Sequence, residues 1–277
     1  MSVHAHPDDE ASKGAGTVAR YAAEGVEATL VTCTGGEAGE ILNPAMDRPE
    51  VHERLAQVRR EELDRSVEII GYRELVMLGY RDSGMPDSEA NADPRCFARA
   101  PLDEAVERLV SVIRRTRPHV IITYGDDQQG YPHPDHLRVH DITLPAWDAA
   151  GDPERFPRAG EPWTPSKLYY SSWSRARFEA MHKGFLDRGL ESPFDQKWFD
   201  RPSHDHLITT QIDVRDHYSA RTGALRAHAT QIDPESVFWF GLPDDVVANL
   251  YPWEDFQLAV SRVPTTPPED DLFAGLR

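Results

Sequence analysis

The first half of the chain alternates short apolar segments with longer amphipathic ones, and this alternation limits the possible folds more than any other feature. Strand-like segments rich in apolar residues occupy 3–6, 27–34, 74–80 and 119–124. Between them, apolar residues recur at helical spacing within 12–24, 51–70 and 102–113. Apolar strands separated by helices are typical of a parallel sheet that helices cover on both faces. We therefore predict an α/β fold with a Rossmann-like, mostly parallel sheet.

The second half of the chain is less regular and is expected to add to this sheet. Strand-like segments lie at 167–173 and 207–214, and a segment rich in proline at 151–165 predicts an exposed loop. The acidic, proline-rich tail at 263–271 is expected to be loosely ordered. We predict a single domain over 1–277, with a βα core half at 1–150 and C-terminal additions at 151–277 that complete the substrate site.

The charge balance excludes several classes of partner. The chain has 47 acidic and 30 basic residues, a formal net charge of −17. Because such a negative surface repels phosphate groups, we expect neither nucleic acid nor an anionic membrane as a partner. No segment approaches the about 18 apolar residues of a membrane span. The N-terminal segment lacks the pattern of a signal peptide. The two cysteines, Cys33 and Cys96, are too few for a disulfide framework. We therefore expect the chain in the cytoplasm.

Two clusters of chemically active side chains follow two of the predicted strands. The first is His6-Pro7-Asp8-Asp9-Glu10, after the first strand, and the second is Tyr131-Pro132-His133-Pro134-Asp135-His136, after the fourth. In doubly wound sheets these two strands are neighbours, and ligands bind beyond their carboxyl ends. One such turn alone is more often structural, but two facing clusters are typical of a site. Two histidines and a carboxylate make a catalytic zinc set with an open position.

A glycine motif offers a rival interpretation. Residues 14–19 read Gly-Ala-Gly-Thr-Val-Ala and match the G-x-G-x-x-A pattern of dinucleotide-binding proteins. That pattern requires the glycines in the turn directly after the strand, but here seven residues, 7–13, intervene. The glycines fall in the predicted helix, where small residues favour close packing against the sheet. A nicotinamide-dependent dehydrogenase is therefore the rejected alternative.

Other reactive side chains are expected to be structural. His140 lies one helical turn after His136 and could reach the same metal, but we expect it to pack or hydrogen-bond nearby. The segment His204-Asp205-His206 is predicted to be a surface loop rather than a second metal site. Neither Cys33 nor Cys96 has the basic neighbours of a reactive thiolate.

The two clusters resemble a known group of enzymes. Ala5-His6-Pro7-Asp8-Asp9-Glu10 together with His133-Pro134-Asp135-His136 resembles the zinc-dependent de-N-acetylases of the PIG-L/LmbE-like superfamily. The longer runs at 3–44, 79–86 and 226–234 resemble the amidase subgroup that acts on S-conjugates of mycothiol.

The resemblance implies a role for each residue of the two clusters. It implies one zinc ion per chain, or ferrous iron in its place, held by His6, Asp9 and His136. Asp8 matches the family's general base, which takes a proton from water and returns it to the leaving amine. Tyr131 and a cationic His133 would stabilise the tetrahedral intermediate. We expect Asp135 to orient one of the histidines from behind.

The implied reaction is hydrolysis of the amide bond of a mycothiol S-conjugate, a small thiol–sugar compound, to a mercapturic acid and glucosaminyl-inositol in thiol-based detoxification. Loops after the second and third strands offer four charged side chains that could bind the sugar hydroxyls: Glu37, Glu40, Arg81 and Asp82. Each of them alone could equally be a solvated surface charge. Lys13, at a position where the subgroup carries lysine, is expected to contact the cysteinyl arm.

Three alternatives stay open at this point. The first is a deacetylase of N-acetylglucosaminyl-inositol, and the second is an amidase that acts on a mycothiol adduct in antibiotic biosynthesis. The third is a sugar-binding protein without turnover, which the presence of Asp8 disfavours because a binding protein needs no general base.

Overall fold

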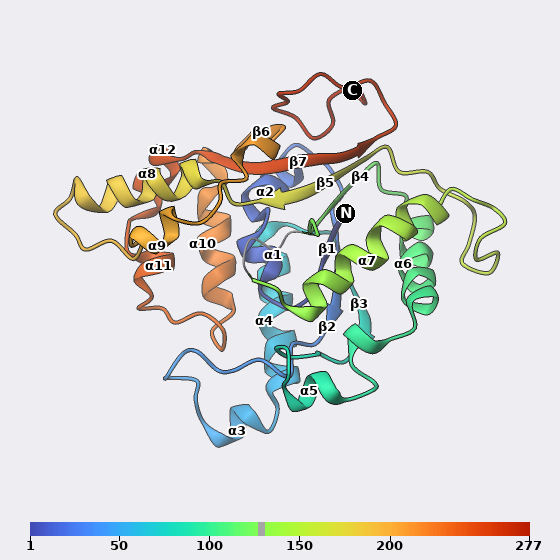
Figure 1. The fold of residues 1–277 in the computed structure, drawn as a ribbon, viewed down its shortest axis with the longest axis horizontal. Helices are drawn as coiled ribbons and strands as arrows, with labels where there is room; N and C mark the ends of the chain where they lie inside the picture. The colour runs from blue at the N-terminus through green and yellow to red at the C-terminus, as the bar shows by residue number, and fades with distance from the viewer. Residues whose placement is uncertain (127–130) are drawn as a thin grey trace.

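The computed structural model describes residues 1–126 and 131–277, and a seven-stranded sheet forms its centre (Figure 1). The strand order is β3-β2-β1-β4-β5-β7-β6. The neighbours from β3 to β5 pair in parallel, whereas β7 is antiparallel to both β5 and β6. This confirms the predicted α/β fold with a mostly parallel sheet. The strands are β1 (Ser2–His4), β2 (Thr29–Thr34), β3 (Glu74–Tyr80), β4 (Val120–Thr123), β5 (Lys167–Ser172), β6 (Thr210–Asp213) and β7 (Trp253–Ser261).

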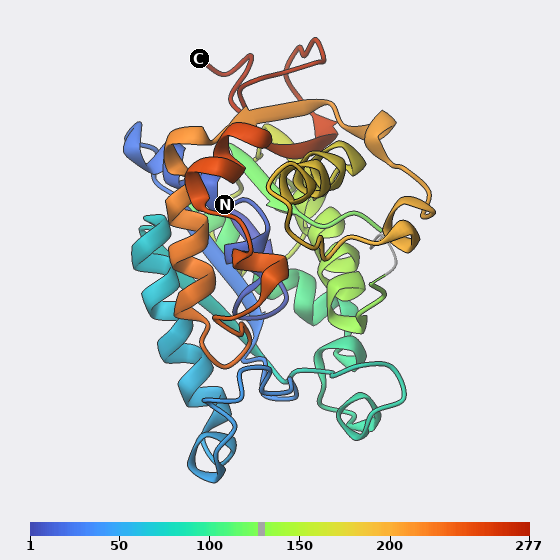
Figure 2. The same ribbon diagram turned by 90° about the vertical axis from the view of Figure 1, so that its left-hand side faces the viewer.

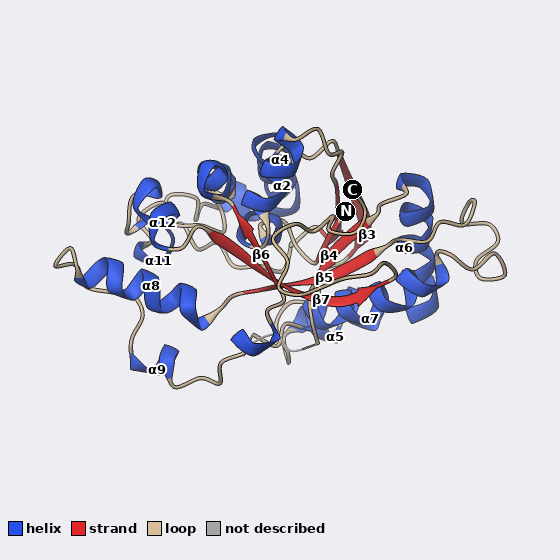
Figure 3. Ribbon diagram, turned by 90° about the horizontal axis from the view of Figure 1, so that it is seen from above, coloured by secondary structure: helices blue, strands red, loops and turns tan. Residues whose placement is uncertain are grey.

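Helices cover both faces of the sheet, with α2 and α4 above it and α7 below it in Figure 3. Figure 2 shows α10, in orange, beside α4, in cyan. The α-helices of the described residues are α1 (Asp9–Ser12), α2 (Ala15–Ala23), α3 (Pro49–His52), α4 (Leu55–Ile70), α5 (Glu89–Ala92), α6 (Leu102–Thr116), α7 (Pro134–Ala149), α8 (Arg175–Leu186), α9 (Gln196–Phe199), α10 (Tyr218–Ala227), α11 (Val237–Phe240) and α12 (Asp244–Leu250).

The alternation of side chains along β2 separates two apolar cores. Leu30 packs with Leu63 and Leu225 in the core under α2, α4 and α10. Its neighbour Val31 belongs to the other core, with residues of α6 and α7 such as Ile113. Successive side chains of a strand point to opposite faces, so the buried strand is apolar throughout.

The predicted first helix is two helices in the structure. Gly14 separates α1 from α2 with a φ of 101°, a left-handed conformation that glycine adopts without a steric penalty. Of the two glycines in the motif, only Gly16 lies within a helix. A Cβ atom there would lie 2.9 Å from Cβ of Val214, which directly follows β6. The small residue thus permits close packing, as expected.

The predicted helix at 51–70 is also divided, into α3 and α4 at Glu53 and Arg54. The apolar positions Val51, Leu55 and Val58 keep helical spacing across the break. For that reason the hydrophobic pattern did not reveal it.

The expectation of a loosely ordered tail is wrong. Glu269 is buried, and its carboxylate lies 2.8 Å from Nζ of Lys167, which is fully buried at the start of β5. The backbone of Glu269 also pairs with Thr210 of β6. A buried ammonium group requires a negatively charged partner, and the tail supplies it.

Strand β7 was not predicted, because buried charges interrupt its apolar pattern. The carboxylate of Glu254 accepts hydrogen bonds from the amides of Gly16 (3.2 Å) and Thr17 (2.8 Å) at the start of α2. Asp255 accepts a hydrogen bond from the hydroxyl of Ser174 at 2.7 Å. Both acidic side chains therefore tie the strand to the elements that surround the site.

Candidate active site

The two predicted clusters meet at one edge of the sheet. The segment from His6 to Asp9 follows β1, and the segment from His133 to His136 begins α7 after β4. Strands β1 and β4 are parallel neighbours, with Ser2 opposite Ile122. Their carboxyl ends therefore lie together, as the sequence predicts.

His6, Asp9 and His136 form a buried group whose ligand atoms all lie within 4.8 Å of one another. Nδ1 of His6 is 3.6 Å from Oδ2 of Asp9, and Nε2 of His136 is 3.3 Å from Oδ1 of Asp9. Two imidazoles and one carboxylate are the donor types of a catalytic zinc site. The structure thus brings together the three residues expected to bind the metal.

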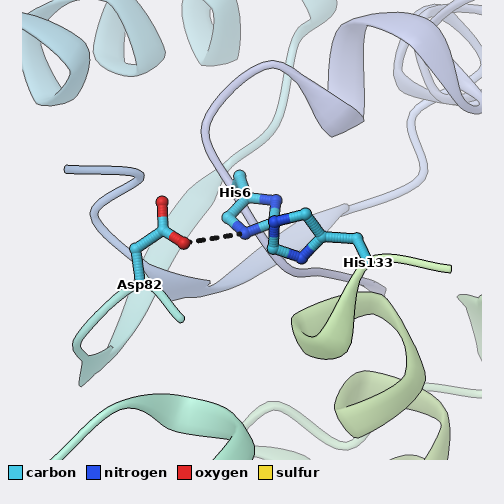
Figure 4. A group of neighbouring side chains, drawn as sticks. All are labelled: His6, Asp82 and His133. Carbon is cyan, nitrogen blue, oxygen red and sulfur yellow. Dashed lines mark ion pairs between the residues drawn. The ribbon is translucent and has the colours of Figure 1, made fainter. Parts of the chain in front are cut away.

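A second group shares His6 and adds Asp82 and His133, again with ligand atoms within 4.8 Å (Figure 4). Nε2 of His6 lies 3.6 Å from Oδ1 of Asp82. The carboxylate of Asp82 also accepts hydrogen bonds from the amides of Gly84 at 2.7 Å and Ala38 at 3.2 Å. The ring of His6 therefore faces Asp9 with one nitrogen and Asp82 with the other.

Asp135 distinguishes the two nitrogens of His6. It is fully buried, and its Oδ2 lies 3.2 Å from Nε2 of His6. The amide and hydroxyl of Ser83 hold the same carboxylate. A carboxylate behind one imidazole nitrogen keeps the proton there and leaves the other nitrogen free to bind a metal. This arrangement favours the group with Asp9, which faces Nδ1.

The carboxylates around His6 attract positive charge. Although burial opposes protonation, the contacts with Asp135 and Asp82 raise the pKa of His6 well above its ordinary value. Burial lowers the pKa of His136, although the Asp9 carboxylate opposes this. The centre of the site is thus suited to a cation.

The surroundings of His133 disfavour the expected cationic state. Burial and the nearby charge of His6 lower the pKa of His133 to about 4. Its ring is therefore neutral at pH 7. Nδ1 accepts a hydrogen bond from the amide of Asp135 at 3.2 Å, so the proton of the neutral ring resides on Nε2.

Asp8 stands beside the metal group without belonging to it. It caps α1 with a φ of 108°, a left-handed conformation that aspartate tolerates better than most residues. Its Oδ2 lies 2.9 Å from Nη2 of Arg59, and its side chain is 26% exposed. Burial raises the pKa of Asp8, and the Arg59 guanidinium opposes the rise. Asp8 is thus a carboxylate that solvent can reach and that belongs to neither of the two metal groups described above.

Three residues hold Asp8 in place, and the sequence did not indicate this role for any of them: Arg59, Glu10 and His228. The buried guanidinium of Arg59 also donates to the backbone carbonyl of Pro7, at 2.5 Å. The Glu10 carboxylate accepts hydrogen bonds from the Asp8 amide at 3.0 Å and from Nε2 of His228 at 2.5 Å. His228 lies in the run 226–234 that carried the family resemblance, but nothing in that run indicated its partner.

The structure places the remaining predicted residues at different distances from the centre. Nζ of Lys13 contacts Asp9 directly, at 2.7 Å. The ring of Tyr131 is 53% exposed, with its centroid 5.5 Å from that of His136.

Among the four expected sugar contacts, only Asp82 contacts the histidines. Glu37 accepts a hydrogen bond from the amide of Asp82, at 3.2 Å. Glu40 is exposed, and Arg81, also exposed, lies 3.5 Å from Asp93.

The residues expected to be structural behave accordingly. Nδ1 of His140 lies 3.1 Å from the backbone oxygen of Tyr124, so this histidine hydrogen-bonds near the site as predicted. His206 is exposed. Cys33 and Cys96 are both buried and free.

Comparison with known proteins decides the family. Residues 1–147 match the PIG-L family, described as GlcNAc-PI de-N-acetylase. The chain belongs to the PIG-L family. Its members are amidases and deacetylases, and this chain is a hydrolase of that kind.

Two curated relatives extend the similarity to the whole chain. The mycothiol S-conjugate amidase of Streptomyces coelicolor is 46% identical over 286 residues, covering 100% of this chain and 97% of the relative. The 1D-myo-inositol 2-acetamido-2-deoxy-alpha-D-glucopyranoside deacetylase of Geodermatophilus obscurus is 40% identical over 289 residues, with coverages of 100% and 97%.

Solved structures support the fold. The N,N'-diacetylchitobiose deacetylase of Pyrococcus horikoshii aligns with a TM-score of 0.64 at 17% identity, over 93% of this chain and 82% of that protein. The conserved protein TT1542 of Thermus thermophilus aligns with a TM-score of 0.59 at 20% identity, over 95% and 96%. Within the described residues, no helix has the length and apolar character to cross a membrane.

Proposed function

We propose that this chain hydrolyses the amide bond of mycothiol S-conjugates, using a metal ion held by His6, Asp9 and His136. The observation that carries the proposal is this buried trio with the Asp8 carboxylate next to it, held by Arg59 and outside the trio. The donor set fits zinc, since two imidazoles and one carboxylate leave a position open. Ferrous iron uses the same ligand types. When bound, the ion supplies a Lewis acid that polarises the carbonyl and makes water more acidic.

The side chains around the trio have distinct roles in amide hydrolysis: Asp8 transfers protons, and its neighbours hold it in place. The Asp8 carboxylate takes a proton from the attacking water and delivers it to the amine that leaves. Burial, which raises the pKa of Asp8, makes it a better proton acceptor. Arg59 and the Glu10–His228 pair hold the backbone and carboxylate of Asp8 in place.

Two neutral donors are proposed to face the oxygen that becomes negative. His133 carries its proton on Nε2, since Nδ1 accepts the Asp135 amide. Tyr131 offers a phenol from the exposed side of the cluster. Donors aimed at a developing oxyanion typically contribute about 10²- to 10³-fold each to the rate.

The substrate assignment rests on the similarity to the amidase of Streptomyces coelicolor, 46% over the whole chain. The products would be a mercapturic acid and glucosaminyl-inositol, and we propose a role in thiol-based detoxification in the cytoplasm, where free thiols such as Cys33 stay reduced. The C-terminal part, residues 151–277, would complete the substrate site. Deacetylation of N-acetylglucosaminyl-inositol is the second candidate, because a deacetylase of that type is 40% identical.

Product analysis distinguishes the two candidates. The purified, metal-loaded chain is incubated separately with the bimane S-conjugate of mycothiol and with N-acetylglucosaminyl-inositol, and the products are identified by mass spectrometry. We expect bimane mercapturic acid and glucosaminyl-inositol from the conjugate at a higher kcat/KM than acetate release from the sugar. A faster deacetylation would assign the second function instead.

A further inference from the structure

A hollow lined by aromatic side chains lies at the start of α8. It is bordered by the start of α8, by α10 and by α11, which lie to the left of the sheet in Figure 1. Its aromatic residues include Trp173, Phe178, Phe238 and Trp239.

A second hollow connects the first one with the site. It shares Trp173 and Arg177 with the aromatic hollow and is also lined by Glu254 and Asp255. Lys13 lines its other side, and Nζ of Lys13 is 2.7 Å from Asp9. A substrate whose amide lies at the metal group can therefore extend past Lys13 toward Trp173.

Two arginines in the aromatic hollow form no ion pair with the residues that the structure describes. Arg221 is only 4% exposed, donates from Nη1 to the hydroxyl of Tyr218 at 3.1 Å, and leaves its buried Nε without a hydrogen bond. The guanidinium of Arg177 lies 5.3 Å from the ring centroid of Trp173. Among the described residues, neither guanidinium has a carboxylate within the 4.0 Å of an ion pair.

This lack of acidic partners is unusual in a chain with 47 acidic and 30 basic residues. Buried charges are normally paired, because removing a charge from water is costly. Burial lowers the pKa of Arg221, and the nearby charge of Arg177 adds to this effect, whereas Tyr218 and the more distant Glu254 carboxylate oppose it. The two cations therefore repel each other. An anion between them would offset both costs.

We infer that the aromatic hollow binds the S-linked group of the conjugate and selects aromatic groups that carry a carboxylate or a similar acidic substituent. This inference rests on the proposed function. The rings of Trp173 and Trp239 give the hollow an aromatic wall against which an apolar ring can pack, and guanidinium groups bind carboxylates through paired, charge-assisted hydrogen bonds. A basic S-linked group would be repelled by Arg177 and Arg221.

The test compares two conjugates that differ only in the acidic group. The metal-loaded chain is given S-benzyl-mycothiol and S-(4-carboxybenzyl)-mycothiol, and kcat/KM is measured for each. We expect the carboxylated conjugate to be preferred about 10-fold or more, the worth of one charged hydrogen bond. Arg177→Gln should remove most of this preference through KM. The matched control Arg188→Gln removes an exposed guanidinium elsewhere on the chain and should retain the preference.

Direct binding separates this inference from the proposed function. Calorimetry measures the affinity of the two mercapturic acids, N-acetyl-S-benzylcysteine and its 4-carboxybenzyl counterpart, for wild type and Arg177→Gln. Equal affinities for the two mercapturic acids together with equal kcat/KM for the two conjugates would overturn the inference, and so would a preference that Arg177→Gln retains. In either case, cleavage of both conjugates would still support the amidase function. Selective binding without cleavage of either conjugate would support the hollow and reject the proposed function.

Discussion

The ammonium group of Lys13 lies 2.7 Å from Oδ1 of Asp9, one of the three residues proposed to bind the metal. The lysine also lies over the ring of Tyr124, 5.6 Å from its centroid, and its side chain is 24% exposed. The Lys13 and His136 charges hold the pKa of Asp9 well below its usual range, although burial opposes this. Lys13 is therefore part of the electrostatic balance of the metal group, whichever substrate is bound.

This contact predicts the behaviour of Lys13→Ala. Because Asp9 would serve every substrate, kcat/KM should fall by a similar factor, about 10-fold, for the bimane conjugate and for N-acetylglucosaminyl-inositol. Steady-state kinetics on both substrates checks this. A fall confined to the conjugate would instead assign Lys13 to the cysteinyl arm, and no fall on either would make it a surface lysine.

The metal assignment predicts a loss of bound ion in His136→Ala. The variant lacks one of three ligands and should not retain one tightly bound zinc per chain, as measured by plasma emission after dialysis. The control is His140→Ala on the same helix, whose ring hydrogen-bonds the backbone of Tyr124. Full zinc content in His136→Ala would transfer the site to the group of His6, Asp82 and His133.

The general base is tested by Asp8→Asn. The amide keeps the shape of the side chain but cannot accept the proton, so kcat should fall by at least about 10² while zinc remains bound. Asp64→Asn, which changes an exposed carboxylate on α4, should keep wild-type kcat. Nearly normal turnover in Asp8→Asn would exclude it as the base. Glu10, the next acidic residue of the motif, could hardly replace it, because it is fully buried.

The parts of the site that the sequence predicts are those encoded locally. His6 and Asp9 lie in one turn, and His136 lies at the start of the helix that follows β4. The alternation of strands and helices placed β1 beside β4, and this was enough to bring the residues together.

What the sequence did not reveal depends on contacts between distant segments. Glu10 and His228 are 218 positions apart, and nothing in the sequence around either residue indicates the other as its partner. Glu269 was assigned to a loose tail because its partner, Lys167, lies more than a hundred positions earlier. Buried charges such as Glu254 also concealed β7, because a strand is recognised by apolar alternation.

The buried pair of Glu10 and His228 predicts a large loss of stability in His228→Ala. Nε2 of His228 lies 2.5 Å from Oε1 of Glu10, and neither side chain is exposed. Burial lowers the pKa of His228, but the Glu10 charge outweighs it and raises the pKa above its ordinary value, which favours the ionic form of the pair. Removing the imidazole leaves the carboxylate buried without a cation, which should cost about 3–5 kcal/mol of the free energy of unfolding.

Urea unfolding of the single and double variants checks this interpretation. Glu10→Gln/His228→Ala has no unpaired buried charge and should lose less stability than His228→Ala alone, even though it carries one more substitution. His206→Ala, at an exposed histidine, should leave the unfolding midpoint unchanged. If the double variant is at least as unstable as His228→Ala, the loss comes from packing around His228 rather than from the charge of Glu10.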